Sequence, residues 1–228
     1  MTGGSVSGGD KLGADQIGTG QQPTVVLSLG SNVGDPLANL QLGLDVLASA
    51  DLVLRAVSSV YQTEPVGGVA QADYLNAVVL AGSSLAAMDV LARCAVAETA
   101  AARVRRQRWG PRTLDVDIVC FGTQVSADPV LTLPHPRAHE RAFVLVPWLE
   151  LDPLAVLPGW GPVAALPAAS AAAGVLRRPE LRLTLPAKAS PVGSASPAQS
   201  AAAAGPAGSA IPSRPASSAS QGTGARCS

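Results

Sequence analysis

Aromatic residues, cysteines and histidines are all scarce in this chain, whose 228 residues include three tryptophans, two tyrosines, two phenylalanines, three cysteines and two histidines. No Cys-x-x-Cys pair occurs, so neither a zinc site nor a disulfide framework is expected. The formal net charge is zero, which argues against a surface dedicated to nucleic acid or to a membrane. No apolar run is long enough to span a bilayer, and no charged-then-apolar start resembles a secretion signal. These absences predict a soluble cytoplasmic protein.

Both ends of the chain lack the hydrophobic periodicity of folded segments. Residues 1–22 are rich in Gly, Ser, Thr and Gln, and residues 187–228 are almost wholly Ala, Ser, Pro and Gly. Such compositions bury too little apolar surface to offset the entropy of ordering, so both tails are expected to be disordered. A single domain is therefore predicted over residues 23–186, with a short helical turn within residues 168–173.

Periodicity within this domain predicts the element order β-α-β-β-α-β. Strands are expected over residues 24–29, 52–61, 74–80 and 114–118, and helices over residues 36–47 and 85–102. Asp35 is expected to cap the first helix, with Pro36 at its first position, and Ser84 to cap the second. The buried stripe of the second helix is expected to hold Leu85, Met88, Leu91 and Cys94. A further helix is predicted over residues 137–149, and short extended pieces at 155–157 and 181–185 are expected to lengthen the sheet.

This element order matches the ferredoxin-like arrangement. The predicted fold class is therefore α+β, with an antiparallel sheet covered by helices in α/β/α layers.

The segment RWGPRTLDVD, residues 108–117, contains the clearest chemical signal. Side chains alternate along a strand, so Asp115 and Asp117 share one face while Leu114, Val116 and Ile118 share the other. Two neighbouring carboxylates repel each other unless a cation lies between them, and oxygen ligands of this kind suit magnesium. The arginines just upstream fit the same site if a polyphosphate bridges them to the metal. The segment therefore predicts a site for a nucleoside triphosphate with magnesium.

Four separated blocks, one of which is this segment, resemble the 6-hydroxymethyl-7,8-dihydropterin pyrophosphokinase family. They are LGSNVGD at 29–35, SVYQTEP at 59–65 with DYLNA at 73–77, RWGPRTLDVD at 108–117, and LPHPR at 133–137 with ERAFVL at 140–145. The blocks occur in the family's order and at its spacing, and the resemblance covers residues 25–158. It implies an enzyme of folate biosynthesis that transfers diphosphate from ATP to a pterin alcohol and releases AMP.

The resemblance also implies the cofactors and partners. Asp115 and Asp117 would hold two Mg²⁺ ions that grip the triphosphate of ATP, the co-substrate. The pterin hydroxyl would attack the β-phosphorus, a step in which positioning and electrostatic stabilisation count most. The expected partners are these small molecules, with no nucleic acid and no membrane, and a monomer is expected.

On the nucleotide side, the resemblance assigns catalytic roles to Arg103, Arg105 and Arg112 besides the two aspartates. The residues expected to bind ATP are Glu98, Arg105, Arg108, Arg112, Thr132, His135 and Arg141. A basic helix end, favoured by the helix dipole, is an alternative explanation of the arginines. It explains Arg106 well and Arg112 poorly, because Gly110 and Pro111 have already ended any helix.

On the pterin side, Tyr74 and Phe143 resemble the family's stacking pair. The carboxamide of Asn76 can donate and accept along the edge of the heterocycle, and Thr63 and Val66 would complete that edge with backbone groups. Trp109 would be a lid residue that closes over the pterin and excludes water.

Two other classes of protein remain as alternatives. An RNA-binding module shares the β-α-β-β-α-β order, but it stacks bases on aromatics of its central strands, and this chain lacks that motif. A catalytically silent pterin- or nucleotide-binding protein would keep the fold. The intact pair Asp115 and Asp117 argues against it.

Overall fold

The structure is a computed structural model that describes residues 22–65, 71–101, 113–171 and 173–187. All of these residues belong to one compact unit. The predicted disordered tails lie almost entirely outside the described residues, so their expected disorder stays a prediction.

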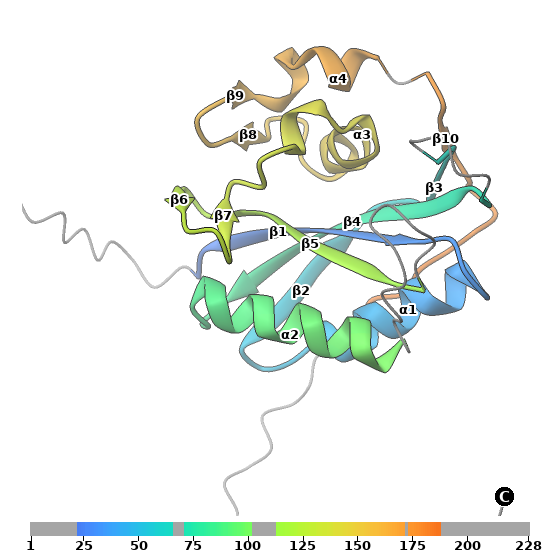
Figure 1. The fold of residues 1–228 in the computed structure, drawn as a ribbon, viewed down its shortest axis with the longest axis horizontal. Coiled ribbons are helices and arrows are strands. Elements are labelled where there is room, and N and C mark those ends of the chain that lie inside the picture. Colours follow the sequence, from blue (N-terminus) through green and yellow to red (C-terminus); the bar gives the residue numbers. More distant parts are fainter. Residues whose placement is uncertain (1–21, 66–70, 102–112, 172, 188–228) are drawn as a thin grey trace, which may run out of the picture. The chain divides into compact units, whose positions relative to one another are not determined.

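An antiparallel sheet of six strands forms the centre of this unit (Figure 1). Its order is β10 (Val175–Arg177), β3 (Tyr61–Thr63), β4 (Tyr74–Ser83), β1 (Thr24–Ser31) and β5 (Asp115–Phe121). The sixth strand, β2 (Leu52–Val57), pairs with the second half of β4, and β3 pairs with the first half. The predicted α+β class with an antiparallel sheet is confirmed.

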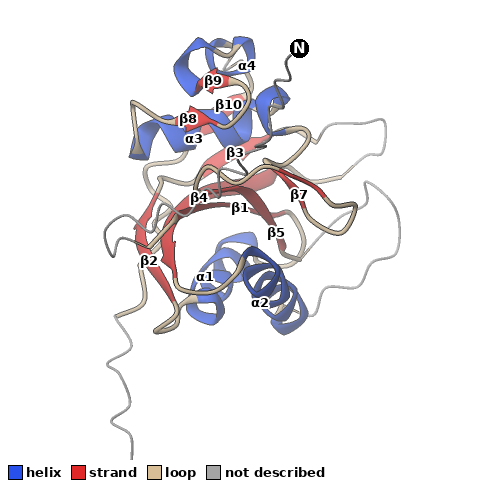
Figure 2. Ribbon diagram, turned by 90° about the vertical axis from the view of Figure 1, so that its left-hand side faces the viewer, coloured by secondary structure: helices blue, strands red, loops and turns tan. Residues whose placement is uncertain are grey.

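Helices cover both faces of the sheet (Figure 2). On one face lie α1 (Pro36–Leu47) and α2 (Ala87–Ala100), and on the other α3 (Ala142–Leu151) and the short α4 (Pro167–Ser170). Each face has its own buried apolar cluster, one built around Leu27, Leu29 and Leu44 and the other around Val78, Leu145 and Trp148. Burial of apolar area on both faces is the main force that holds the layers together.

The remaining elements are small. A hairpin of β6 (Ser126–Ala127) and β7 (Thr132–Leu133) follows β5, and a second one of β8 (Val156–Leu157) and β9 (Gly161–Pro162) follows α3. Two 3₁₀ turns, η1 (Ala138–Glu140) and η2 (Val163–Ala165), complete the list of described elements. No helix in the described part of the chain is both long enough and apolar enough to span a bilayer.

The first helix begins as predicted, because a side chain satisfies its free amides. The Asp35 carboxylate accepts a hydrogen bond of 3.0 Å from the amide of Ala38, and Pro36 occupies the first turn, where its missing N–H costs nothing.

The predicted start of the second helix is wrong. Ser84 donates to Asp51 instead of capping, and α2 begins at Ala87 after Ala86, which makes no side-chain cap. The buried residues of α2 are Ala87, Val90, Cys94 and Ala97, of which the prediction named Cys94. The predicted Leu85 and Leu91 are partly buried against the same core, while Met88 is 48 % exposed.

The single strand predicted over residues 52–61 is two strands, β2 and β3. The break falls at Ser58, whose hydroxyl accepts a hydrogen bond of 3.0 Å from the amide of Val78. A serine side chain that takes the place of a backbone acceptor interrupts the ladder. β3 therefore pairs with β4 as a separate strand of three residues.

Three later predictions also need correction. The helix expected over residues 137–149 is η1 followed by α3, separated at Arg141, whose backbone is extended. The extended piece at 155–157 pairs with β9 in its own small sheet, and residues 181–185 form no strand. The sheet is lengthened instead by β10, which pairs with β3.

The short helical turn predicted within residues 168–173 corresponds to α4.

Candidate functional site

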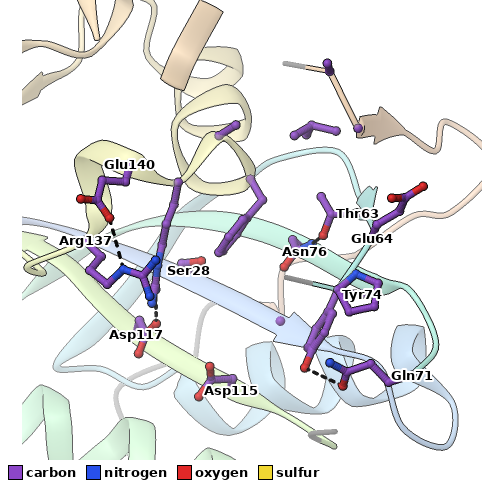
Figure 3. Close-up of a pocket in the computed structure, with 18 residues that line it drawn as sticks. Ser28, Thr63, Glu64, Gln71, Tyr74, Asn76, Asp115, Asp117, Arg137 and Glu140 are labelled. Atoms are coloured by element: carbon purple, nitrogen blue, oxygen red, sulfur yellow. Dashed lines mark hydrogen bonds and ion pairs between the residues drawn. The ribbon is translucent and has the colours of Figure 1, made fainter. Parts of the chain in front are cut away.

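A pocket of about 500 Å³ lies between the sheet and the start of α3 (Figure 3). β1, β3, β4 and β5 form its floor and wall, and the segment from η1 to the first residues of α3 faces them. Residues 173–175, at the start of β10, line it from a third side. Acidic and basic side chains line one half of the pocket, and the other half contains an aromatic ring, a buried amide and the carboxylate of Glu64 (Figure 3).

The two aspartates of β5 both line this pocket. Their neighbours on the other face of the strand, Val116 and Ile118, are 5 % and 4 % exposed and belong to the core on the side of α1 and α2. The predicted alternation along this strand is therefore confirmed. Leu114, directly before it, is fully buried and anchors the strand where it enters the site.

The carboxylate of Asp117 is contacted by two side chains, those of Arg141 and His135. Its Oδ2 accepts a hydrogen bond of 2.9 Å from Nη1 of Arg141, and Nε2 of His135 lies 3.8 Å from the same oxygen. The Arg141 side chain is 19 % exposed and that of Asp117 33 %. A half-buried charge needs a partner of this kind.

The ring of His135 has a defined orientation. Its Nδ1 accepts the amide of Arg137 at 3.1 Å, and its own amide donates to the carbonyl of Val119 at 2.8 Å. Burial lowers the pKa of His135 below its ordinary value, although the charge of Asp117 opposes this. The imidazole is therefore neutral at physiological pH. Since Nδ1 accepts, the proton lies on Nε2 and points toward Asp117.

The donor set on β5 fits magnesium shared with a polyphosphate. Among the described residues, no group of three or more His, Cys, Asp or Glu side chains is arranged to hold a metal ion by itself. Magnesium in nucleotide sites is commonly held by one or two carboxylates, with phosphates and water in the remaining positions. Asp115 and Asp117 supply such a pair at the pocket wall.

The other half of the pocket is centred on Asn76, which is 4 % exposed. Its amide nitrogen donates to the hydroxyl of Thr63 at 2.9 Å, which joins β4 to β3. Gly30 on β1 makes space for the Asn76 side chain, because a Cβ at this position would lie 3.3 Å from the Asn76 Oδ1. Tyr74 lines the same wall, and its hydroxyl donates to Gln71 at 3.3 Å (Figure 3).

Phe143, in the first turn of α3, lines the pocket from the helix side. The guanidinium of Arg141 lies 5.6 Å from the centre of its ring, a distance that suits a cation–π contact. This contact connects the aromatic half of the pocket to the charged half.

The structure thus brings together most of the predicted site residues that it describes. Seven of them line the pocket, namely Thr63, Tyr74, Asn76, Asp115, Asp117, Arg141 and Phe143, and His135 contacts Asp117. Two others do not line it. Glu98 on α2 accepts the amide of Val116 at 3.0 Å, and the hydroxyl of Thr132 donates to the carbonyl of Asp128. The predictions for Val66, Arg103, Arg105, Arg108, Trp109 and Arg112 lie outside the described residues.

Sequence reasoning missed several lining residues. Arg137 and Glu140 form an ion pair of 3.2 Å at the pocket edge. Opposite charges three residues apart in the sequence could have predicted this pair. Gly174 and Val175 line the pocket because β10 pairs with β3. No local pattern announces that pairing.

Comparison with known proteins adds an independent finding. Residues 26–153 match the family described as 7,8-dihydro-6-hydroxymethylpterin-pyrophosphokinase (HPPK). The chain is similar to a protein of Mycobacterium tuberculosis named 2-amino-4-hydroxy-6-hydroxymethyldihydropteridine pyrophosphokinase, with 48 % identity over 143 residues that cover 58 % of this chain and 74 % of that one. A protein of the same name from Pseudomonas aeruginosa is 38 % identical over 156 residues, which cover 68 % of this chain and 96 % of the relative.

A solved structure described as "Crystal Structure Analysis of the HPPK-DHPS in complex with substrates" is similar in fold. Its TM-score is 0.50 at 10 % identity, and the match covers 66 % of this chain and 43 % of that one. At this identity the likeness concerns the fold alone.

Proposed function

Because the chain belongs to the 7,8-dihydro-6-hydroxymethylpterin-pyrophosphokinase (HPPK) family, we propose that it transfers a diphosphate group from ATP to the hydroxymethyl group of 6-hydroxymethyl-7,8-dihydropterin. AMP is released, and the product serves folate biosynthesis. The protein is accordingly an ATP-dependent diphosphotransferase. The observation that carries the proposal is the two-sided pocket, with paired carboxylates and an arginine in one half and an aromatic ring beside a buried amide in the other.

The aromatic half is the proposed pterin site. Tyr74 and Phe143 line the pocket from the sheet and from α3 and would contact the two faces of the heterocycle. Asn76 would bind its polar edge, since a carboxamide both donates and accepts hydrogen bonds. Thr63 and the backbone of Val66 would extend that edge.

The charged half is the proposed site of the triphosphate. Asp115 and Asp117 would hold two Mg²⁺ ions, which when bound would neutralise the polyphosphate oxygens and orient the chain of phosphates. Arg141 and the Nε2–H of His135 are donors directed toward the same place. Arg103, Arg105, Arg108 and Arg112 would add guanidinium groups, Glu98 and Thr132 would contact the nucleotide, and Trp109 would close over the pterin.

The reaction needs mainly positioning from the protein. The pterin hydroxyl oxygen forms a bond to the β-phosphorus, the bond from that phosphorus to the oxygen it shares with the α-phosphate breaks, and AMP leaves with that oxygen. The hydroxyl proton passes to solvent. Negative charge gathers on the non-bridging oxygens, where Arg141 donates and stabilises the transition state.

Two finer features of the chain belong to the same proposal. The sheet order β3, β4, β1, β5 supports a ferredoxin-like topology, in which β2 and β3 together correspond to one interrupted strand. The proposed domain comprises residues 23–186. We also propose that the protein acts as a monomer, and we place that action in the cytoplasm, where ATP is available.

A nucleotide product assay tests this function. The purified protein is mixed with magnesium, ATP and 6-hydroxymethyl-7,8-dihydropterin, and AMP is separated from ADP. We expect AMP only when the pterin is present. ADP would mean transfer of a single phosphoryl group and would overturn the proposal, as would pterin binding with no nucleotide product, which would indicate a silent binding protein.

A further inference from the structure

A cluster of hydrogen bonds surrounds Glu150, in the last turn of α3 and outside the set of residues that line the pocket. Its Oε2 accepts a hydrogen bond of 2.8 Å from the hydroxyl of Tyr61 on β3. Its Oε1 accepts one of 2.8 Å from the hydroxyl of Ser59, whose amide also donates at 3.1 Å. Arg177 on β10 lies 3.5 Å from Oε1 and donates to the Ser59 hydroxyl at 2.9 Å.

These contacts join three elements that are distant in sequence. Glu150 belongs to α3 and Arg177 to β10, while Tyr61 begins β3 and Ser59 lies two residues before it. We call these four residues the Glu150 clamp. Since β3 and β10 have only three residues each, few backbone hydrogen bonds hold them, and side-chain anchors contribute a large share of what fixes their position.

The clamp is charge-assisted at neutral pH. Burial raises the pKa of Tyr61 to about 12, and the hydrogen bond and charge of Glu150 add to this, so the hydroxyl keeps its proton. Burial alone would raise the pKa of Glu150, but the hydrogen bonds from Tyr61 and Ser59 lower it below its ordinary value. An ionised acceptor with a neutral hydroxyl donor makes one of the stronger hydrogen bonds found in proteins.

The elements that the clamp joins form the walls of the proposed pterin half. In the register of β3 with β4, Tyr61 lies opposite Asn76, and Thr63 lies opposite Tyr74. β10 pairs with β3 so that Val175, a lining residue, lies opposite Thr63. The helix that carries Glu150 at its end carries Phe143 at its start.

We propose that Glu150 is a positioning residue that sets the spacing between the two walls of the pterin half, through Tyr61, Ser59 and Arg177. The inference rests on the proposed function, since the ligand of that half is the pterin. It assigns Glu150 no contact with substrate. A flat ring held between two aromatic side chains is sensitive to the gap between them, because small displacements of a binding wall cost large factors in rate and affinity.

The test compares Glu150→Ala with Glu150→Gln. The alanine variant loses every contact that Glu150 makes and keeps only the hydrogen bond from Arg177 to Ser59. We expect its KM for the pterin to rise about tenfold while its KM for ATP stays within about twofold of wild type. The glutamine variant keeps one oxygen that accepts from Tyr61 or Ser59, and we expect it to recover most of that loss. A role in stability alone would move both KM values alike, or neither.

The matched control is Glu180→Ala. Glu180 pairs with Arg178 on the segment that follows β10, so the variant also removes the carboxylate partner of an arginine but leaves the clamp intact. We expect its kinetics to match wild type. Equal effects of the two alanine variants on the pterin KM would overturn the positioning role.

A milder variant covers the case in which Glu150→Ala does not fold. Tyr61→Phe removes one hydrogen bond of the clamp, and we expect a rise of about threefold in the dissociation constant of the pterin, measured by titration calorimetry with a non-hydrolysable ATP analogue present. An unchanged constant would overturn the proposal. Because this readout is binding, it stands even if the wild-type protein forms no AMP, a result that would reject the proposed function instead.

Discussion

Replacing Asp117 by asparagine should abolish transfer while leaving the fold nearly intact. The substitution keeps the shape of the side chain and removes its charge. In the structure, that charge meets Nη1 of Arg141 at 2.9 Å, and the side chain is 33 % exposed. The same carboxylate is one of the two proposed ligands of magnesium, so one change tests a structural contact and a chemical role together.

The loss of stability should be small. A hydrogen bond to a charged group contributes about 1.5–3 kcal/mol to folding, but solvent screens a side chain that is one-third exposed, and the asparagine oxygen can still accept from Arg141. We therefore expect a loss of about 1 kcal/mol. For a domain of this size, that lowers Tm by about 3 °C.

The loss of activity should be far larger, on the order of 10³-fold in kcat, because the polyphosphate loses part of its charge stabilisation in the transition state. AMP formation at saturating substrates measures it. Thermal unfolding with magnesium and a non-hydrolysable ATP analogue gives a second readout. Ligand at a hundred times its dissociation constant stabilises a protein by about 2.7 kcal/mol, and the variant should lose most of this gain.

Asp45→Asn is the control, since Asp45 is an exposed carboxylate that accepts a hydrogen bond from Gln41 on α1. It should behave as wild type in both assays. The reasoning would be refuted if Asp117→Asn kept more than about a tenth of the wild-type rate. An activity loss that merely followed a large loss of stability would refute it equally.

Three further predictions concern other parts of the molecule. Asn76→Ala should weaken pterin binding about tenfold or more with unchanged nucleotide affinity, as seen by titration calorimetry, and equal weakening of both ligands would contradict its assignment to the pterin edge. Leu114→Ala should cost about 2–5 kcal/mol in urea unfolding, because Leu114 is fully buried, and a cost under about 1 kcal/mol would show that the strand is not anchored there. Because the pKa of Glu150 lies below its ordinary 4.5 in the folded protein, its stabilising contribution is fully present above pH 4.5 and is lost as the pH falls through the lowered value. Glu150→Gln should therefore reduce the loss of stability at acidic pH, measured as the free energy of unfolding against pH. An unchanged loss would contradict this contribution of Glu150.

Features fixed by neighbouring residues were predictable from the sequence. Side-chain alternation placed Asp115 and Asp117 on one face of their strand, and Asp35 with Pro36 marked the start of α1. Both depend on residues within one turn or one strand. The break at Ser58 and the late start of α2 depend instead on partners twenty to thirty-three positions away, Val78 for the first and Asp51 for the second. A local pattern contains no information about such pairs.

The candidate site divides in the same way. Family resemblance, not periodicity, singled out Tyr74, Asn76 and Phe143, and the structure brings all three to one pocket. The ion pair between Arg141 and Asp117 spans 24 positions, and the wall formed by β10 comes from a pairing more than a hundred residues from β3 in sequence. These contacts arise from the order of the strands in the sheet, so they are seen only in the folded structure.

β5 lies at an edge of the described sheet, and an edge strand invites another chain to add itself by backbone pairing. Two outward-facing backbone groups of β5 are already taken. The Glu98 carboxylate accepts the amide of Val116, and the amide of His135 donates to the carbonyl of Val119. Both contacts reduce the number of backbone groups on β5 with which another chain could pair. Substitutions at Glu98 meant to probe nucleotide binding are expected to lower the concentration at which the protein self-associates, which light scattering would detect without any substrate present.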